Sequence, residues 1–188
     1  MVDLEADAVE LVESRYAEWT DRFEAERTRL RDALDAADLD DRVHRIEHVG
    51  STAVPDLAAK DVVDVDLVVG DGTVVDVASA VETRLGGTRY DNGDGWNPVA
   101  RCHDGQRFNV HVFGRSDDGW KTSVATRDVL RARSGLCDEY ERLKRDLAAE
   151  HDDLEAYSIG KTAFVETVLR TAREADDLSF GFEVPRVE

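Results

Sequence analysis

The chain has 188 residues, of which 41% are hydrophobic, so it can form one domain with a sizeable core. It contains no run of about 18 uncharged apolar residues, and its start, "MVDLEADAVE", has neither the basic segment nor the apolar core of a signal peptide. Asp and Glu number 42 against 24 Lys and Arg, a net charge of −18 that repels phosphate backbones and anionic membranes, so we expect a cytoplasmic protein that binds neither nucleic acid nor membrane.

The acidic residues are spread along the whole chain, and nearly all of the positive charge is arginine, since only four lysines occur. Such a surface is typical of a salt-loving host, where dissolved salt screens the repulsion between carboxylates. We therefore interpret the acidity as halophilic adaptation. The two cysteines, Cys102 and Cys137, are far apart, and we expect both to be small buried apolar residues.

In the first half of the chain, apolar residues at helical spacing predict a long amphipathic helix over residues 3–37. A strand is expected at 43–48, followed by a Gly-Ser-Thr turn at 50–52. The Val-rich segment "VVDVDLVV", residues 62–69, is the strongest strand signal in the sequence. A helix from residue 71 is expected to have Thr73 as its N-cap and to end at Gly86 and Gly87.

In the second half, the Gly, Asn and Asp residues of "YDNGDGWNP", 90–98, predict a loop. "VARC" and "RFNVHVFG" follow as two antiparallel strands joined by a turn at 103–106. From residue 116 to about 175 we expect three helices, with breaks near 134–135 and 151–157. These elements predict a single α/β (α+β) domain over residues 1–175, with residues 176–188 as a loose tail.

Two aspartates lie in the middle of the Val-rich strand. Because the side-chain period of a strand is two, Asp64 and Asp66 project from the same face, about 6–7 Å apart. Two carboxylates on one face of an apolar strand repel each other and are costly to bury, and a bound divalent cation removes that cost. The alternative is that the strand lies at a sheet edge, where both side chains are simply solvated.

The Gly-Ser-Thr turn precedes this pair. Gly50 allows a positive φ or a close approach to a ligand, and the consecutive amides and hydroxyls of Ser51 and Thr52 can form an anion site. An ordinary tight connection is the alternative. A phosphate-binding turn beside a metal-binding pair is what a nucleoside triphosphate with its Mg²⁺ requires.

These residues carry a resemblance. "VGS", twelve further residues and "DVDL" resemble the Gly-Ser and Asp-x-Asp pattern of the polymerase-β-type nucleotidyltransferase superfamily. Within it, "IEHVGSTAVPDLAAKDVVDVDLVV" is similar to the HxGSTxVPGLxAKPxIDxxV stretch of the GrpB-like family. The match continues through "NVHVF", "TRDVLR", "YERLKRDL" and "IGKTAFV", and it covers about residues 43–170. Asp56 and Asp61 depart from the family's Gly and Pro, and we interpret both as acidic surface substitutions.

The resemblance implies a nucleotidyltransferase-like mixed sheet with flanking helices and a C-terminal helical bundle that closes a cleft. It implies that Asp64 and Asp66 are catalytic and hold Mg²⁺ or Mn²⁺, and that Gly50, Ser51 and Thr52 hold phosphates. Active members of this fold place a third carboxylate on a neighbouring strand. Here that strand offers Asn109 and His111, so His111 is the third candidate metal ligand.

Other cations are candidates for contacts to the substrate. Arginine forms bidentate clamps on phosphate, and lysines are rare in this chain, although surface lysines and an ion pair of Arg127 with an Asp carboxylate are the structural alternatives. The candidate residues are Lys60, Arg101, Arg127, Lys144 and Lys161.

The implied function is that of a metal-dependent nucleotidyltransferase, which binds a nucleoside triphosphate and transfers a nucleotidyl group to an unknown acceptor. The alternative is a non-catalytic module that binds a nucleotide or another phosphorylated small molecule and acts with a partner enzyme. GrpB-like domains also occur joined to a CoA-biosynthesis kinase, which suits either function.

Overall fold

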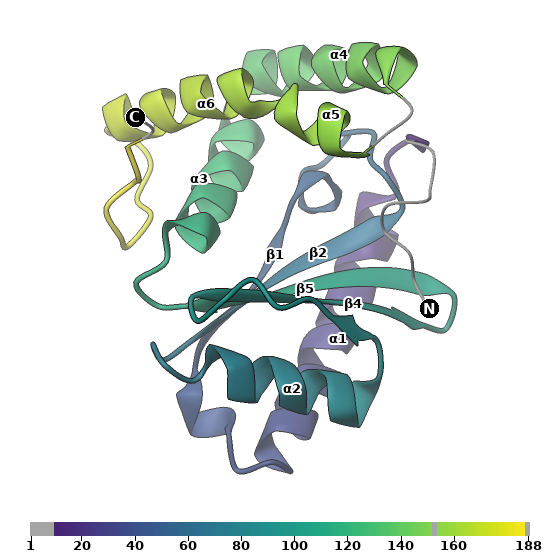
Figure 1. The fold of residues 1–188 in the computed structure, drawn as a ribbon. Helices are drawn as coiled ribbons and strands as arrows, with labels where there is room; N and C mark the ends of the chain where they lie inside the picture. Colours follow the sequence, from purple (N-terminus) through teal and green to yellow (C-terminus); the bar gives the residue numbers. More distant parts are fainter. Residues whose placement is uncertain (1–9, 152–153, 187–188) are drawn as a thin grey trace.

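The computed structural model describes residues 10–151 and 154–186 and contains a five-stranded mixed sheet with helices on both faces (Figure 1). The central pair of strands is parallel and the other neighbours are antiparallel. The strands lie in the order β1 (Val43–Val49), β2 (Val62–Val69), β5 (Gln106–Gly114), β4 (Trp96–His103) and β3 (Thr88–Arg89). The predicted α+β mixed sheet is confirmed.

The helices form two layers (Figure 1). One face of the sheet is covered by α1 (Tyr16–Asp35) and α2 (Val74–Leu85). The other carries α3 (Asp118–Ala132), α4 (Ser134–Glu150), α5 (Leu154–Ile159) and α6 (Thr162–Glu174). Two 3₁₀ turns, η1 (Asp40–Arg42) and η2 (Ser51–Ala53), flank β1. Among the described residues, no helix has both the length and the apolar character needed to cross a membrane.

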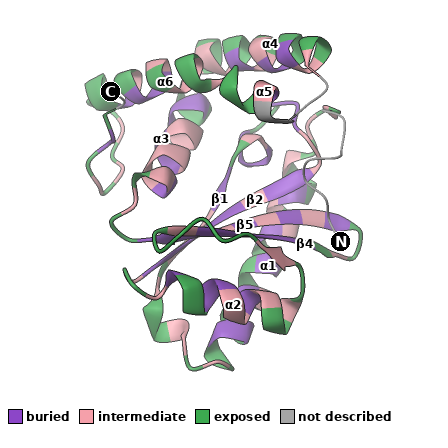
Figure 2. Cartoon of the chain, in the orientation of Figure 1, coloured by how far each residue is buried: buried purple, intermediate pink, exposed green. Residues whose placement is uncertain are grey.

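The main core lies between the sheet and the α1–α2 layer, and Figure 2 shows β2 buried along nearly its whole length. Val63, Val65 and Leu67 alternate along β2 and all point into this core, where they are fully buried. Trp19 and Phe23 of α1 pack against them. Because alternate residues of a strand face opposite sides, this packing directs the Asp residues of β2 toward the α3–α6 layer.

A second core holds the helical layer together. Apolar residues of α3, α4 and α6 enclose Val54 and Leu57, which follow the Gly-Ser-Thr turn. Residues 176–186, expected as a loose tail, also pack here, since Val184 is buried and Arg133 forms an ion pair with Asp177. Phe180 and Phe182 of this tail pack against the same core, and their burial offsets the entropic cost of ordering the segment.

The first helix is shorter than predicted. Residues 3–9 of the expected helix lie outside the described residues, and residues 10–15 are not helical. Val12 instead exchanges two backbone hydrogen bonds with Ala59, at 2.8 and 3.0 Å, a pairing that a helical backbone cannot make. Asp61 accepts bonds from Arg15 and from the Trp19 indole, so it anchors α1 rather than being a plain surface substitution.

Other boundaries differ in smaller ways. Strand β4 begins at Trp96, inside the predicted loop, and includes Pro98, which is tolerated because its outer neighbour β3 has only two residues. Thr73 occupies the predicted N-cap position, but its hydroxyl donates to the Gly70 carbonyl instead of accepting from helix amides. Helix α5 forms inside the predicted break, so the described residues of the second half contain four helices rather than three.

The hairpin between β4 and β5 is confirmed, and both of its turn residues, Asp104 and Gly105, have positive φ, as a tight two-residue turn requires. The expectation for the cysteines is wrong. Cys102 is exposed on β4, and Cys137 is half-buried on α4.

Candidate functional site

The Gly-Ser-Thr turn lies directly against the first aspartate of β2. Gly50 has a φ of 71°, and a β-carbon built on it would lie 2.4 Å from Asp64 Oδ2. Only glycine fits this position, because any side chain would both strain the backbone and displace the carboxylate. The two motifs that the sequence separates by twelve residues are therefore in contact.

Three side chains support the turn from behind. The Lys144 amine donates to Ser51 Oγ at 3.1 Å and to the Ala58 carbonyl. The His48 ring lies 3.0 Å from Thr52 Oγ1, through its Nε2 atom. Arg131 Nε donates to the Ala53 carbonyl at 2.8 Å. Each residue of η2 is thus held from another element, so the turn is rigid before any ligand arrives.

His48 is neutral at physiological pH. Burial lowers the pKa of His48 to about 4, against the opposing effect of the Asp64 charge, and the nearby Arg131 and Arg127 lower it further. A neutral ring can brace the turn without adding positive charge.

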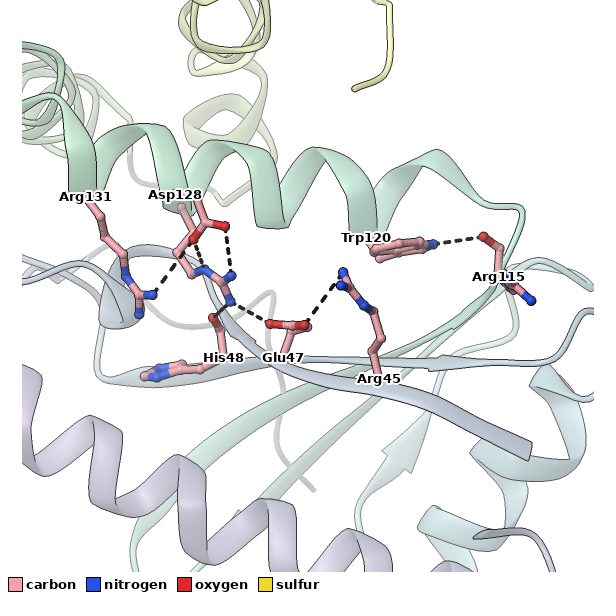
Figure 3. Close-up of polar contacts among 8 residues, drawn as sticks. Arg45, Glu47, His48, Arg115, Trp120, Asp128 and Arg131 are labelled. Carbon is pink, nitrogen blue, oxygen red and sulfur yellow. Dashed lines mark hydrogen bonds and ion pairs between the residues drawn. The ribbon is translucent and has the colours of Figure 1, made fainter. Parts of the chain in front are cut away.

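A network of arginines and carboxylates joins α3 to β1 just behind this turn (Figure 3). Arg127 donates to Glu47 at 2.8 Å, to the His48 carbonyl at 2.9 Å and to Asp128 at 2.7 Å. With all these bonds made, Arg127 fixes the helical layer to the sheet. It does not line the cleft beside the aspartates, so the structural ion pair that the sequence left open is what forms.

The second aspartate is the most unusual group in the site. Asp66 is fully buried, and neither of its carboxylate oxygens has a hydrogen-bond partner. Burial raises the pKa of Asp66 to about 7, although the charge of His111 and the nearby Ser123 hydroxyl, whose proton goes to the Gly119 carbonyl, act in the opposite direction. The edge-strand alternative is wrong for this residue, because β2 lies between β1 and β5. Two orphaned buried oxygens are what a bound cation would satisfy.

The register of the parallel pair places Asn109 beside Asp64 and His111 beside Asp66. Asn109 Nδ2 lies 3.4 Å from Asp64 Oδ1, and His111 Nε2 lies 3.9 Å from the same atom. The position where a third carboxylate would lie is therefore occupied by an amide and an imidazole.

A contact from β4 restricts what His111 can do. The Trp96 indole, which can only donate, donates to His111 Nδ1 at 3.2 Å, and the Asn109 side-chain amide nitrogen lies 2.9 Å from His111 Nε2, so both ring nitrogens already have a protein partner. Burial acts to lower the pKa of His111, but the Asp64 carboxylate 3.9 Å away and the charge of Asp66 outweigh this and raise it. A metal would need a ring nitrogen that neither Trp96 nor Asn109 occupies, so this geometry disfavours His111 as the expected metal ligand.

The aspartates and the turn form one wall of a cleft of about 740 Å³. The opposite wall comes from the helical layer, with Tyr140 of α4, Tyr157 and Ser158 of α5, and Lys161. Lys161 Nζ lies 4.4 Å from the centre of the Tyr157 ring, and Lys60 Nζ lies 5.8 Å from the same ring. An acidic wall thus faces an aromatic wall with two lysines.

The electrostatics of this second wall suit an anion. Burial lowers the pKa of Lys161 to about 8, helped by Lys60 and opposed by Asp64. Burial likewise lowers the pKa of Lys144 to about 7. Both amines are held where an added negative charge would restore their protonation.

The structure brings together most of the predicted residues. Of the candidates, the cleft is lined by Gly50, Ser51, Thr52, Lys60, Asp64, Asp66, His111 and Lys161. Lys144 lies immediately behind Ser51. Arg101 lies on the face of the sheet covered by α1 and α2, because it is two residues after Val99, which points into that core. There it is buried in an ion pair with Glu26 of α1. It is not a substrate clamp.

The sequence reasoning missed the two tyrosines. Tyr140 stands four residues before Lys144, so helical spacing puts both on one face, and this signal was available. Tyr157 and Ser158 lie on a helix of six residues in a segment predicted to be a break, and no pattern pointed to them.

The donor set fits one divalent cation better than two. In the described parts of the chain, no group of three or more His, Cys, Asp or Glu side chains is arranged to hold a metal ion. Mg²⁺ needs only one or two protein carboxylates when phosphates and water complete its shell, so Asp64 and Asp66 suffice for a single ion bound with its ligand.

Comparisons with known proteins agree with this architecture. A family model described as GrpB protein matches residues 8–171. The chain belongs to the GrpB family. It is 34% identical over 174 residues to a UPF0157 protein of Deinococcus radiodurans, covering 91% of this chain and 86% of that one. A UPF0157 protein of Halalkalibacterium halodurans is 31% identical, with 82% and 77% covered.

A solved structure supports the same assignment. The crystal structure of the conserved protein GrpB from Enterococcus faecalis superposes with a TM-score of 0.73 at 26% identity, over 87% of this chain and 96% of that one. The mixed sheet with its two helical layers is therefore the fold of the GrpB family.

Proposed function

We propose that this GrpB-family protein binds a nucleoside triphosphate with one Mg²⁺ or Mn²⁺ ion in the cleft and transfers its nucleotidyl group to an acceptor. The observation that carries the proposal is the contact of Gly50 with Asp64, beside the orphaned carboxylate of Asp66. A braced turn whose Ser51 lines the cleft and a pair of carboxylates that a cation would neutralise lie on one cleft wall, which is what a metal–phosphate ligand requires.

The roles of the residues follow from their positions. Asp64 and Asp66 would hold the cation, which neutralises phosphate charge. Ser51 and the backbone amides of the turn would meet phosphate oxygens, while Lys161 on the opposite wall and Lys60 just before β2 would approach the phosphates as cations. Tyr157, with a lysine on its face, forms an apolar surface within the cleft.

A second function is favoured by one specific observation. Asn109 and His111 occupy the place of a third carboxylate, and an amide cannot remove a proton from an acceptor. The chain would then be a non-catalytic module that binds a nucleotide or another phosphorylated small molecule for a partner enzyme, such as the CoA-biosynthesis kinase that the family resemblance suggested.

Two measurements on one preparation separate the functions. Calorimetry with each triphosphate, with and without Mn²⁺, should give binding only with the metal, and Asp66→Asn should abolish it. Asp104→Asn, on the exposed hairpin, is the matched control and should bind normally. Pyrophosphate release identifies the transferase, and binding without release identifies the module. Equally strong triphosphate binding without metal contradicts both functions, because it would show that Asp64 and Asp66 take no part in binding.

A further inference from the structure

A transferase needs a base for the hydroxyl that attacks, and the wall of β5 does not supply one. Asn109 has no basic atom, and both ring nitrogens of His111 are engaged, Nδ1 by the Trp96 indole and Nε2 by the Asn109 amide. A base must therefore come from elsewhere, or the cleft performs no transfer. The remaining candidates are cleft hydroxyl groups that touch a basic atom.

Two such pairs occur on the Gly-Ser-Thr turn. Thr52 lies 3.0 Å from His48, but only 1% of Thr52 is exposed, so no substrate phosphorus can reach it. Ser51 is half-buried, lines the cleft, and lies 3.1 Å from the Lys144 amine. Ser51 is thus the hydroxyl that a ligand and a base can reach at once.

The surroundings of Lys144 suit a base better than a permanent cation. Its side chain is 1% exposed, and the partners of its amine are a hydroxyl and a carbonyl, neither of them charged. Burial lowers the pKa of Lys144 to about 7, so a large fraction of the amine is neutral near physiological pH. The neutral amine has a lone pair that can accept the Ser51 proton.

We propose that Ser51 is a nucleophile, that Lys144 is its general base, and that Ser51 accepts the nucleotidyl group from a triphosphate bound in the cleft. Ser51 Oγ forms a bond to the α-phosphorus, the bond from that phosphorus to the bridging oxygen of the β-phosphate breaks, and pyrophosphate leaves with the electron pair. The Ser51 proton passes to Lys144 Nζ, which becomes an ammonium. This inference rests on the proposed function and names its acceptor.

The main test is mass spectrometry of the full chain after incubation with each triphosphate and Mn²⁺. We expect the mass to rise by one nucleoside monophosphate, with the adduct mapped to the peptide that contains Ser51. Ser51→Ala should remove the adduct. Ser158→Ala, which changes another serine of the same cleft, is the matched control and should keep it.

Two substitutions of Lys144 distinguish a base from a phosphate contact. Lys144→Arg keeps the positive charge but cannot take up a proton, so a base role predicts that adduct formation falls about 100-fold or more. Lys144→Met removes both the charge and the basic nitrogen, and its rate of adduct formation should fall equally. If Lys144→Arg forms the adduct at the wild-type rate, the base assignment is overturned. Melting temperatures show which variants fold.

A second probe needs no nucleotide. A fluorophosphonate, which loses fluoride when a serine oxygen attacks its phosphorus, should label Ser51 in the wild type and label it poorly in Lys144→Met. If Ser51 of the wild type is not labelled, its assignment as a nucleophile is overturned.

Calorimetry on the same samples separates this inference from the function beneath it. Metal-dependent triphosphate binding with no adduct overturns the inference and leaves the proposed function standing. Absence of binding rejects the function itself, and the inference with it.

Discussion

Arg127 of α3 donates a hydrogen bond to the Glu47 carboxylate of β1 at 2.8 Å, although 80 residues separate the two in the chain. Both side chains are mostly shielded from water, and Arg127 also binds the His48 carbonyl next to the Gly-Ser-Thr turn. The pair therefore sets the position of the helical layer over the sheet, and with it the width of the cleft.

Replacing Arg127 by Met should destabilise the fold by about 1–3 kcal/mol, because Glu47 is left half-buried without its partner. Urea unfolding of the single variants and of the double variant with Glu47→Gln measures the coupling between the two residues. Arg142→Met, whose guanidinium makes only an exposed bond to the Asp138 carbonyl among the described contacts, is the control and should change stability by less than about 0.5 kcal/mol. Equal losses in the two arginine variants would contradict a structural role for Arg127.

Gly50→Ala should cost both stability and ligand binding, because the new methyl group meets Asp64 Oδ2 in addition to straining a backbone at φ 71°. Gly105→Ala is the matched control, since its φ is 78° and no atom lies within 4 Å of the added carbon. Backbone strain alone costs about 1–3 kcal/mol. Thermal unfolding should show a larger loss at Gly50 than at Gly105. Similar losses with metal binding intact would show that Asp64 simply moves aside.

The pH dependence of stability should report Asp66. Its pKa is raised from 3.8 to about 7 in the folded protein, so the folded state holds a proton that the unfolded state has lost. The contribution of Asp66 to stability is therefore complete below about pH 4 and is lost as the pH rises toward and through 7.

Melting curves of the wild type and of Asp66→Asn should accordingly diverge over that pH range, with the Asn variant gaining relative stability as the pH rises. Mn²⁺ should restore the wild type at pH 8 and leave the variant unchanged. If the melting temperatures of the two proteins change in parallel with pH, the Asp66 carboxylate has a hydrogen-bond partner that keeps its pKa near the ordinary value.

The acidity of the whole chain gives a prediction about salt. If the net charge of −18 reflects halophilic adaptation, screening of carboxylate repulsion should raise the melting temperature from about 0.1 M to about 2 M KCl. Sodium chloride at matched ionic strength separates screening from a specific effect of potassium. A flat or falling melting temperature would reject the interpretation.

The sequence was enough to place the sheet and the acidic wall of the cleft, because both depend on local signals. The period-two pattern of β2 fixes which way Val65 and Asp66 point, and Gly50 marks the close approach to Asp64. The opposite wall depends on how α4 and α5 pack on the sheet, which no local pattern encodes. The prediction that Arg101 contacts the substrate was wrong for the same reason. Its ion-pair partner, Glu26, lies 75 residues away in the sequence, and no local pattern reveals that contact.

The two cysteines give this chain a built-in pair of labelling sites. Cys102 is exposed on the sheet and Cys137 is half-buried on α4. Spin labels on both therefore measure the distance between the sheet and the helical layer without any substitution. Burial and the charge of Asp138 raise the pKa of the Cys137 thiol, which slows its alkylation and allows the two sites to be labelled one after the other. Distance distributions with and without a ligand would then show directly whether the helical layer closes over the sheet.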